Sequence, residues 1–201
     1  MVDYTPLKEK VLNADGTIRV LPANEWLSFG WDMVRWFMHE YPIYVLPTQE
    51  LLFKLAELID GFKTIEIGAG SGNIGRNLGI RMTDSYLQER KDIKMYYSAM
   101  GQPTIKYPKD VWRSDALSAT KVLKPECVLG CYVTHYSLEG EGNSWGVDFP
   151  RLIKMVKRLI LVGNKHIHSA NPIMSLPHEE IAVEGLLTRN DDRDADRIFV
   201  W

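Results

Sequence analysis

Residues 64–75 read Thr64-Ile-Glu-Ile-Gly-Ala-Gly-Ser-Gly-Asn-Ile-Gly75. The first four residues have the apolar, β-branched character of a buried strand, and a glycine run begins directly after them at Gly68. Glycine lets the backbone turn tightly and approach a ligand without a Cβ in the way. A helix expected over Ser71–Leu78 would direct free N–H groups and its positive dipole end at that ligand. The stretch therefore predicts a ligand site where the strand ends.

Around this stretch, short apolar runs alternate with segments of helical periodicity. Such alternation predicts a parallel sheet with helices on both faces, and the apolar run Glu126–Val133 is typical of its middle. A polar turn at 190–194 predicts a closing antiparallel hairpin. We expect a three-layer α/β/α, Rossmann-like fold whose mainly parallel seven-stranded sheet ends in a C-terminal antiparallel hairpin. Strands are expected at 64–67, 80–83, 111–112, 126–133, 159–162, 181–187 and 197–201, and helices at 48–60, 71–78, 86–99, 116–123 and 149–157.

The N-terminal part has a different composition. Residues 1–47 are expected to form an extension with an edge helix, and residues 48–201 one compact domain. Residues 1–24 are expected to be extended, with a short strand at 17–21. The aromatic-rich segment Glu25–His39 is expected to be a helix packed on the domain edge, with a lid or a dimer surface as the alternative.

The glycine run is compatible with two classes of cofactor. Gly70-x-Gly72-x-x-Gly75 satisfies the dinucleotide pattern, which also needs an acid about 20 residues further on. The nearest acid at a strand end is Asp84, only 14 residues after Gly70. Glu66, two residues before the first glycine, has no function in the dinucleotide pattern. The spacing therefore disfavours a nicotinamide oxidoreductase, which stays as the lesser alternative.

In this setting residues 48–201 resemble the class I S-adenosylmethionine-dependent methyltransferases. Their first motif is an apolar strand, an acid and G-x-G-x-G, matched here by Ile65–Gly72. The resemblance implies S-adenosylmethionine as cofactor, with Asp84 on the ribose hydroxyls, which a carboxylate accepts well, and Asp115 on the adenine amine. Both aspartates have helix capping as an alternative role. The implied cofactor-binding residues are Glu66, Gly68, Ala69, Gly70, Gly72, Asp84, Asp115, Ala116 and Cys131.

Two further features refine the resemblance. The runs E-I-G-A-G at 66–70 and V-T-H at 133–135 also resemble methyltransferase-like proteins that include phage-encoded ones. The stretch from Gly72 to Asp84 is shorter than usual in the family and contains two more glycines, so its helix must be short.

In that family the loop after the fourth strand is where the methyl group and the acceptor meet, and Gly130–His135 matches it. The ordinary imidazole pKa of about 6.5 suits His135 to the role of general base, so it is the expected catalytic residue. A hydrogen-bonded structural histidine is the alternative. The expected substrate-binding residues are Tyr132, Thr134, Asn164 and His166.

Other chemistries are less favoured at these loops. Cys131 lies inside an apolar strand and is expected in the core rather than as a nucleophile. The loop lacks the N/D-P-P-Y/F run of enzymes that methylate base amino groups. His166 and His168, with His135 or His178, could bind a metal ion, but we expect no metal.

Composition limits the partners. There are 24 Lys and Arg and 26 Asp and Glu residues, a formal net charge of −2, which gives no global attraction for nucleic acid. Cys127 and Cys131 on one strand would lie roughly 13 Å apart, too far for a disulfide, and free thiols fit a reducing compartment. Residues 1–11 lack a signal-peptide pattern, and no apolar run approaches the roughly 20 residues that cross a bilayer. We therefore expect a cytoplasmic protein with no membrane partner.

The expected function is S-adenosylmethionine-dependent methyl transfer to an acceptor, small molecule or macromolecule, that the sequence does not identify. One alternative is a non-catalytic module that binds the cofactor or its product S-adenosylhomocysteine. Another is an interaction protein that keeps the fold without the ligand. The oligomeric state stays open.

Overall fold

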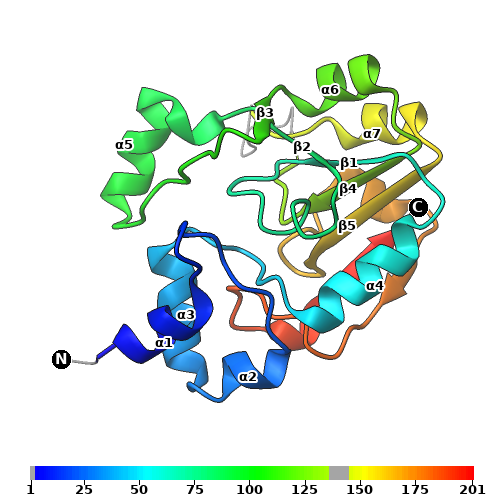
Figure 1. Ribbon diagram of the computed structural model, residues 1–201. Helices are drawn as coiled ribbons and strands as arrows, with labels where there is room; N and C mark the ends of the chain where they lie inside the picture. The colour runs from blue at the N-terminus through cyan, green and yellow to red at the C-terminus, as the bar shows by residue number, and fades with distance from the viewer. Residues whose placement is uncertain (1–2, 136–144) are drawn as a thin grey trace.

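The computed structural model describes residues 3–135 and 145–201 (Figure 1). Its strands form one seven-stranded sheet in the order β3-β2-β1-β4-β5-β7-β6. The first five strands in that order are parallel, and β7 runs antiparallel to both β5 and β6. The predicted α/β, Rossmann-like fold with a C-terminal antiparallel hairpin is confirmed. The strands are β1 (Thr64–Ile67), β2 (Arg81–Asp84), β3 (Val111–Arg113), β4 (Cys127–Cys131), β5 (Arg158–Asn164), β6 (Glu179–Ile181) and β7 (Asp196–Val200).

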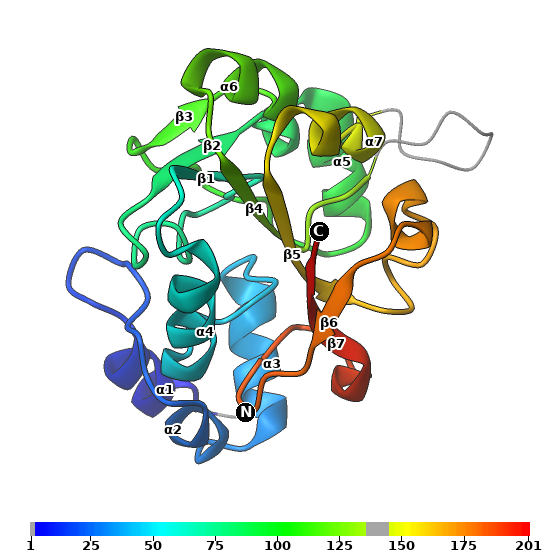
Figure 2. The ribbon, with the colours of Figure 1, turned by 90° about the vertical axis from the view of Figure 1, so that its right-hand side faces the viewer.

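Helices cover both faces of the sheet (Figures 1 and 2). On one face, α4 (Gln49–Ile59) packs on a cluster that includes Leu129 of β4. On the other, α6 (Ala116–Leu123) and α7 (Phe149–Leu152) pack on a cluster that includes Val128. Because successive strand residues point to opposite faces and both faces are buried, β4 and residues 159–163 of β5 are apolar.

The ends of α4 are where the capping residue Thr48 and the turn residue Gly61 predict them. Thr48 caps the helix, its Oγ1 accepting a hydrogen bond from the N–H of Leu51 at 3.3 Å. The helix ends before Gly61, whose φ of +74° suits a residue without a Cβ.

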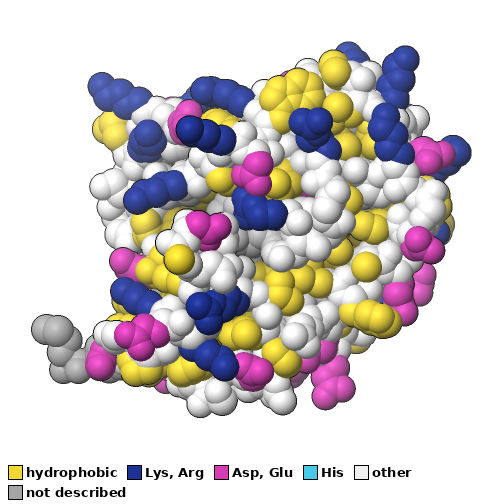
Figure 3. All heavy atoms as spheres, in the orientation of Figure 1, with side chains coloured by type: hydrophobic (Ala, Val, Ile, Leu, Met, Phe, Trp, Pro, Cys, Tyr) yellow, Lys and Arg dark blue, Asp and Glu magenta, His cyan; other side chains and the backbone are white. Residues whose placement is uncertain are grey.

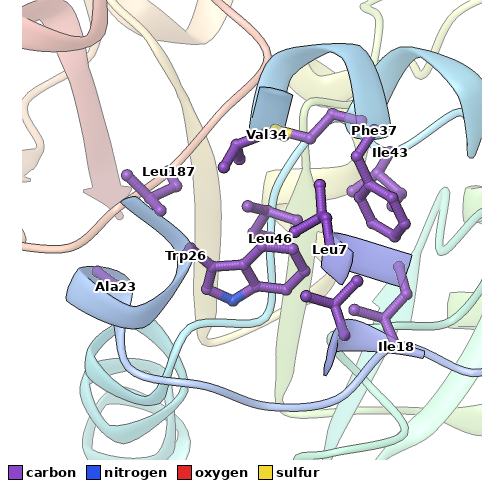
Figure 4. Close-up of a cluster of buried hydrophobic side chains, with 11 residues drawn as sticks. Leu7, Ile18, Ala23, Trp26, Val34, Phe37, Ile43, Leu46 and Leu187 are labelled. Atoms are coloured by element: carbon purple, nitrogen blue, oxygen red, sulfur yellow. The ribbon is translucent and has the colours of Figure 1, made fainter. Parts of the chain in front are cut away.

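The N-terminal region builds a core of its own from α1 (Thr5–Val11), α2 (Ala23–Leu27) and α3 (Trp31–Glu40) (Figure 4). Trp26 and Phe37 are fully buried in it. Leu187, from the connection between β6 and β7, completes the cluster, so the region packs at that connection. The division of the chain at residue 47 remains a prediction.

Three N-terminal expectations are wrong. Residues 1–24 are not an extended lead-in, because Leu7 and Val11 bury one side of α1. The stretch 17–21 forms isolated bridges rather than a strand. The single helix expected over Glu25–His39 is interrupted at Gly30, whose φ is +83°.

The helix expected over Ser71–Leu78 is also absent; residues 71–79 form successive turns. In a helix the N–H of Gly75 would donate to the carbonyl of Ser71, but here both groups have other partners. The N–H donates to Glu66 Oε2 at 2.8 Å, and the Ser71 carbonyl accepts from Arg76 at 3.2 Å. Gly72, with a φ of +72°, lies outside helical geometry. No α-helix follows the glycine loop, so the expected positive end of a helix dipole is absent from this side of the loop.

Other element boundaries differ because local geometry interrupts the periodic segments. The expected helix 86–99 begins with a left-handed Tyr86 and splits into a 3₁₀ turn, η1 (Leu87–Glu89), and α5 (Lys91–Ala99). The expected helix 149–157 is α7 followed by η2 (Ile153–Met155). The sixth strand lies at 179–181 instead of 181–187, where Gly185 turns the chain with a φ of +88°. The remaining 3₁₀ turns are η3 (Pro172–Ser175) and η4 (Arg193–Ala195).

Two expectations from composition can be compared with the structure. Cys127 and Cys131 are both free, as the strand geometry predicts. Within residues 3–135 and 145–201, every helix is too short or too polar to span a bilayer.

Candidate active site

A cavity of about 910 Å³ lies at the carboxyl edge of the parallel strands. This volume falls within the roughly 300–1,000 Å³ of small-molecule sites. The ends of β1, β2 and β4 form its floor, and the segment Pro42–Val45 and helix α5 form opposite walls. Most residues implied by the resemblance line it together: Glu66, Gly68, Ala69, Gly70, Asp84, Asp115, Ala116, Cys131, Tyr132 and Thr134. Gly72, His135, Asn164 and His166 do not line it.

The glycine loop is held against the end of β2. Gly70 has a φ of +56°, in the left-handed region that disfavours other residues. Its N–H donates to Asp84 Oδ2 at 2.9 Å. A Cβ at this position would project to within 3.2 Å of Ile105 Cδ1, on the cavity wall. A bare backbone is therefore built into the cavity floor.

Glu66 explains the third glycine of the pattern. Its side chain is 2% exposed, and a Cβ on Gly75 would lie 2.5 Å from its Oε2. Gly75 is thus required so that its N–H can reach this carboxyl group. Burial raises the pKa of Glu66 to about 8, although the bond from Gly75 opposes the change. Glu66 is therefore mostly protonated at neutral pH.

Cys131 lies beside Glu66. Burial and the neighbouring Glu66 carboxyl raise the pKa of the Cys131 thiol well above its ordinary value. Because the thiolate is the nucleophilic form, this residue packs against the cavity and does not attack.

Asp84 stands at the end of β2 and is 8% exposed. Its two oxygens accept from the N–H groups of Gly70, at 2.9 Å, and Tyr86, at 2.8 Å, and burial raises its pKa. The Tyr107 hydroxyl also hydrogen-bonds to this carboxyl group, so about one of its roughly four lone-pair sites remains for a ligand. The ring of Tyr107, stacked on Tyr86 at 4.1 Å between centroids, lines the same part of the cavity.

Asp115 has the capping role that was its alternative. It caps α6 by accepting from the N–H of Ser118 at 3.0 Å, and it also lines the cavity with Ala116. The start of α6 therefore holds this carboxyl group at the edge of the cavity.

Aromatic side chains form a wall that sequence reasoning missed. Tyr44 comes from the N-terminal segment and Tyr97 from α5, and their hydroxyl oxygens lie 3.2 Å apart. Gln88 Nε2 also donates to the Tyr97 hydroxyl, at 3.3 Å. The density of tyrosine between residues 86 and 107 was a usable signal, but it does not show which rings meet. The further aromatic members are Tyr96, Tyr107 and Trp145.

The described cavity lining has acidic side chains and no basic ones. Its described members include four carboxyl groups, Glu66, Asp84, Asp115 and Asp148, and no Lys or Arg. Figure 3 shows Lys and Arg side chains on the outer surface over the region of α5 and α6. The lining therefore favours a cationic ligand over an anionic one.

A second cavity, of about 360 Å³, adjoins the first. Tyr44, Tyr132 and Thr134 border both, and the others lining it are His135, Ile167, His168, Arg189 and Asn190. The expected catalytic His135 thus lies beyond Thr134 in the smaller cavity. Burial lowers its pKa, so its imidazole is neutral at pH 7.

Two expected acceptor contacts are not supported by the geometry. Asn164 is fully buried; its Nδ2 donates to Asp196 Oδ1 and the Asp192 carbonyl, each at 2.8 Å, and its Oδ1 accepts from the N–H of His166 at 3.0 Å. It lines neither cavity because the start of β7 lies beside it. His166 points to the exterior, 3.3 Å from Asp192.

Tyr132 lines both cavities, but its hydroxyl is occupied, donating to Asp196 at 2.6 Å. Its ring, rather than its hydroxyl, is what a ligand would meet. No group of three or more His, Cys, Asp or Glu side chains suited to a metal ion occurs in the part of the chain that the structure describes.

No protein-family model matches the chain, and no curated protein matches it. Among solved structures, it is similar to a protein from Pyrococcus horikoshii that carries a provisional assignment as an RNA methyltransferase, with 16% identity and a TM-score of 0.32 over 75% of this chain and 76% of that one. A likeness of this degree carries no argument about function.

Proposed function

We propose that the large cavity binds S-adenosylmethionine and that the chain transfers its methyl group to an acceptor. The observation that carries this proposal is the glycine loop fixed between two buried carboxyl groups. Glu66 holds it at Gly75 and Asp84 holds it at Gly70. The loop, the two acids and Asp115 all face one cavity at the carboxyl edge of the sheet.

The same site is poorly suited to a dinucleotide. A pyrophosphate is bound by the N-terminus of a helix, and residues 71–79 form turns instead. The lining contains carboxyl groups and no described basic side chain, so it offers no favourable partner for a pyrophosphate. S-Adenosylmethionine has no phosphate and carries two positive groups, a sulfonium and an ammonium. The sheet order, with β7 between β5 and β6, also departs from the dinucleotide order 3-2-1-4-5-6.

The residues present fit the cofactor. Asp84 would accept from a ribose hydroxyl through its remaining lone pair, and Asp115 and Ala116 would border the adenine. The bare Gly70 backbone permits a close approach. When bound, the cofactor supplies an electrophilic methyl group.

The chain itself contributes binding and orientation. Alignment of the acceptor with the bond that breaks supplies much of the acceleration in such reactions. Thr134 and the rings of Tyr44 and Tyr132, which border both cavities, are placed to orient an acceptor beside the cofactor site. The segment Pro42–Val45 and residues of α5 line that site.

Thermal unfolding tests the cofactor assignment. A ligand at a hundredfold excess over its Kd stabilises the folded state by about 2.7 kcal/mol. For a domain of this size each kcal/mol raises Tm by about 2–4 °C, so S-adenosylmethionine or S-adenosylhomocysteine should raise Tm by roughly 5–10 °C. NAD should give no comparable rise. No shift at millimolar S-adenosylmethionine, or an equal shift with NAD, would contradict the proposal.

Turnover separates an enzyme from a binding module. Purified protein incubated with S-adenosylmethionine and a cell extract should form S-adenosylhomocysteine above the extract alone. The Gly70→Ala protein serves as the control for contaminating methyltransferases. A cofactor-dependent Tm shift without turnover would identify a non-catalytic module.

A further inference from the structure

The smaller cavity differs in charge from the larger one. Its described lining includes one guanidinium, Arg189, two imidazoles, His135 and His168, and no carboxyl group. The larger cavity has four carboxyl groups and no basic side chain on its described lining. The two cavities meet at Tyr44 and Thr134, so an acid-lined compartment opens beside a basic one.

Arg189 is fixed in this position. The backbone N–H of Arg189 donates to the backbone carbonyl of Tyr44 at 2.9 Å. The guanidinium carbon of Arg189 lies 4.2 Å from the centroid of the Tyr44 ring. The side chain is half-buried, and no carboxylate of the described residues lies within 4.0 Å of it, whereas the nearby Arg35 pairs with Asp191 at 2.6 Å. A partly desolvated cation without a counter-charge favours binding of an anion.

The two imidazoles add neutral hydrogen-bonding groups. His168 is buried, its Nδ1 lies 3.0 Å from the Asn164 backbone nitrogen, and its ring meets Tyr132 edge-on at 5.2 Å. Only Nε2 of His168 is therefore available to a ligand. His135 lies on the same lining, so one charged fork and two neutral rings face one small space.

We propose that the smaller cavity is an anion subsite that binds a carboxylate or phosphate group of the methyl acceptor. Arg189 matches either group, because its planar fork forms two parallel hydrogen bonds to such oxygens. The rest of the acceptor passes Tyr44 and Thr134 and presents its reacting atom in the larger cavity. The identification of the ligand as the acceptor rests on the proposed function; the anion subsite itself does not.

Two probes distinguish the chemical sources of the anion. Inorganic phosphate and sodium benzoate are titrated into the full chain, without ligand and with S-adenosylhomocysteine, while the imidazole resonances of His135 and His168 are followed by NMR. Saturable shifts of both imidazoles are expected. Tighter binding of phosphate indicates a phosphorylated acceptor, and tighter binding of benzoate indicates a carboxylate on a planar group.

Substitutions of Arg189 have a matched control in the same region. Arg193 lies over the ring of Trp31 at 4.1 Å, as Arg189 lies over Tyr44, but outside the cavity. Arg189→Gln should weaken anion binding at least about tenfold, equivalent to about 1.4 kcal/mol. Arg193→Gln should leave it unchanged, and Arg189→Lys, which keeps the charge without the fork, should lie between.

The outcomes are separable from those of the cofactor test. Absence of saturable imidazole shifts with both probes, or equal affinities in the two Gln variants, overturns the subsite even if S-adenosylmethionine raises Tm. Anion binding that depends on Arg189 supports it, even if the cofactor produces no rise in Tm and the proposed function fails.

Discussion

Replacing Glu66 by glutamine should remove a pH dependence of stability that is built into the cavity floor. The folded pKa of Glu66 is about 8 against an ordinary value of 4.5, because burial disfavours the charged form. Between these values the folded state holds one more proton than the unfolded state, so stability falls as pH rises. Each pH unit is worth about 1.36 kcal/mol, so the loss between pH 4.5 and 8 approaches roughly 5 kcal/mol.

The Glu66→Gln protein keeps the acceptor for the Gly75 N–H but cannot ionise. Urea unfolding of both proteins at several pH values from 5 to 8.5 measures the difference in the free energy of unfolding. His39, His135 and His168 have pKa values lowered by burial, so their stabilising contribution rises with pH through the lower part of this range. Because they are present in both proteins, the difference between the two curves isolates Glu66.

The variant should gain several kcal/mol relative to the natural chain between pH 5 and 8.5. Parallel curves would show that Glu66 is ionised in the folded protein at neutral pH. That result would refute the argument that its burial, rather than the Gly75 hydrogen bond, dominates its pKa.

Three other predictions follow from the site. Gly70→Ala and Gly79→Ala place a Cβ at similar left-handed φ values of +56° and +67°, each at a cost of about 1–2 kcal/mol in stability. Calorimetry should show loss of S-adenosylhomocysteine binding only for Gly70→Ala, since Gly79 has open space around it. Equal affinities of the two variants would make Gly70 a simple turn residue. Asn164→Ala should lower the free energy of unfolding by at least about 1–3 kcal/mol and leave cofactor affinity unchanged in the folded protein, because its amide bonds only to the protein; a changed affinity would restore it to the ligand site. His135→Ala should leave cofactor affinity unchanged and raise KM for the acceptor, whereas a loss of about 10²–10⁴-fold in kcat would identify a general base instead.

The parts of the fold that were predictable from sequence have local causes. Thr48 caps α4 through its own side chain, and β4 and residues 159–163 of β5 are apolar because helices cover both sheet faces. The failures have tertiary causes. The turns at 71–79 arise because Gly75 donates to a carboxyl group on a neighbouring strand, a contact that helical periodicity cannot reveal.

In the candidate site, too, some residues were predictable from sequence and others depend on tertiary contacts. Glu66, Asp84 and Asp115 were expected from the resemblance, and they line one cavity because the carboxyl ends of parallel strands converge on one edge. Asn164 is also the last residue of a parallel strand, β5, but β7 runs antiparallel beside it, and Asn164 Nδ2 donates to Asp196. The contact between Tyr44 and Tyr97 joins segments 53 residues apart, and no spacing rule anticipates it.

That contact has a consequence for ligand exchange. The two hydroxyl groups link the segment Pro42–Val45 to α5 across the cavity, and a single hydrogen bond of this kind is worth about 1 kcal/mol. Both tyrosines lie outside the sheet, so the walls can separate while every strand pairing stays intact. We expect product release to be limited by how often these two segments part, so that Tyr97→Phe shortens the residence time of the product without changing the resting structure of the sheet.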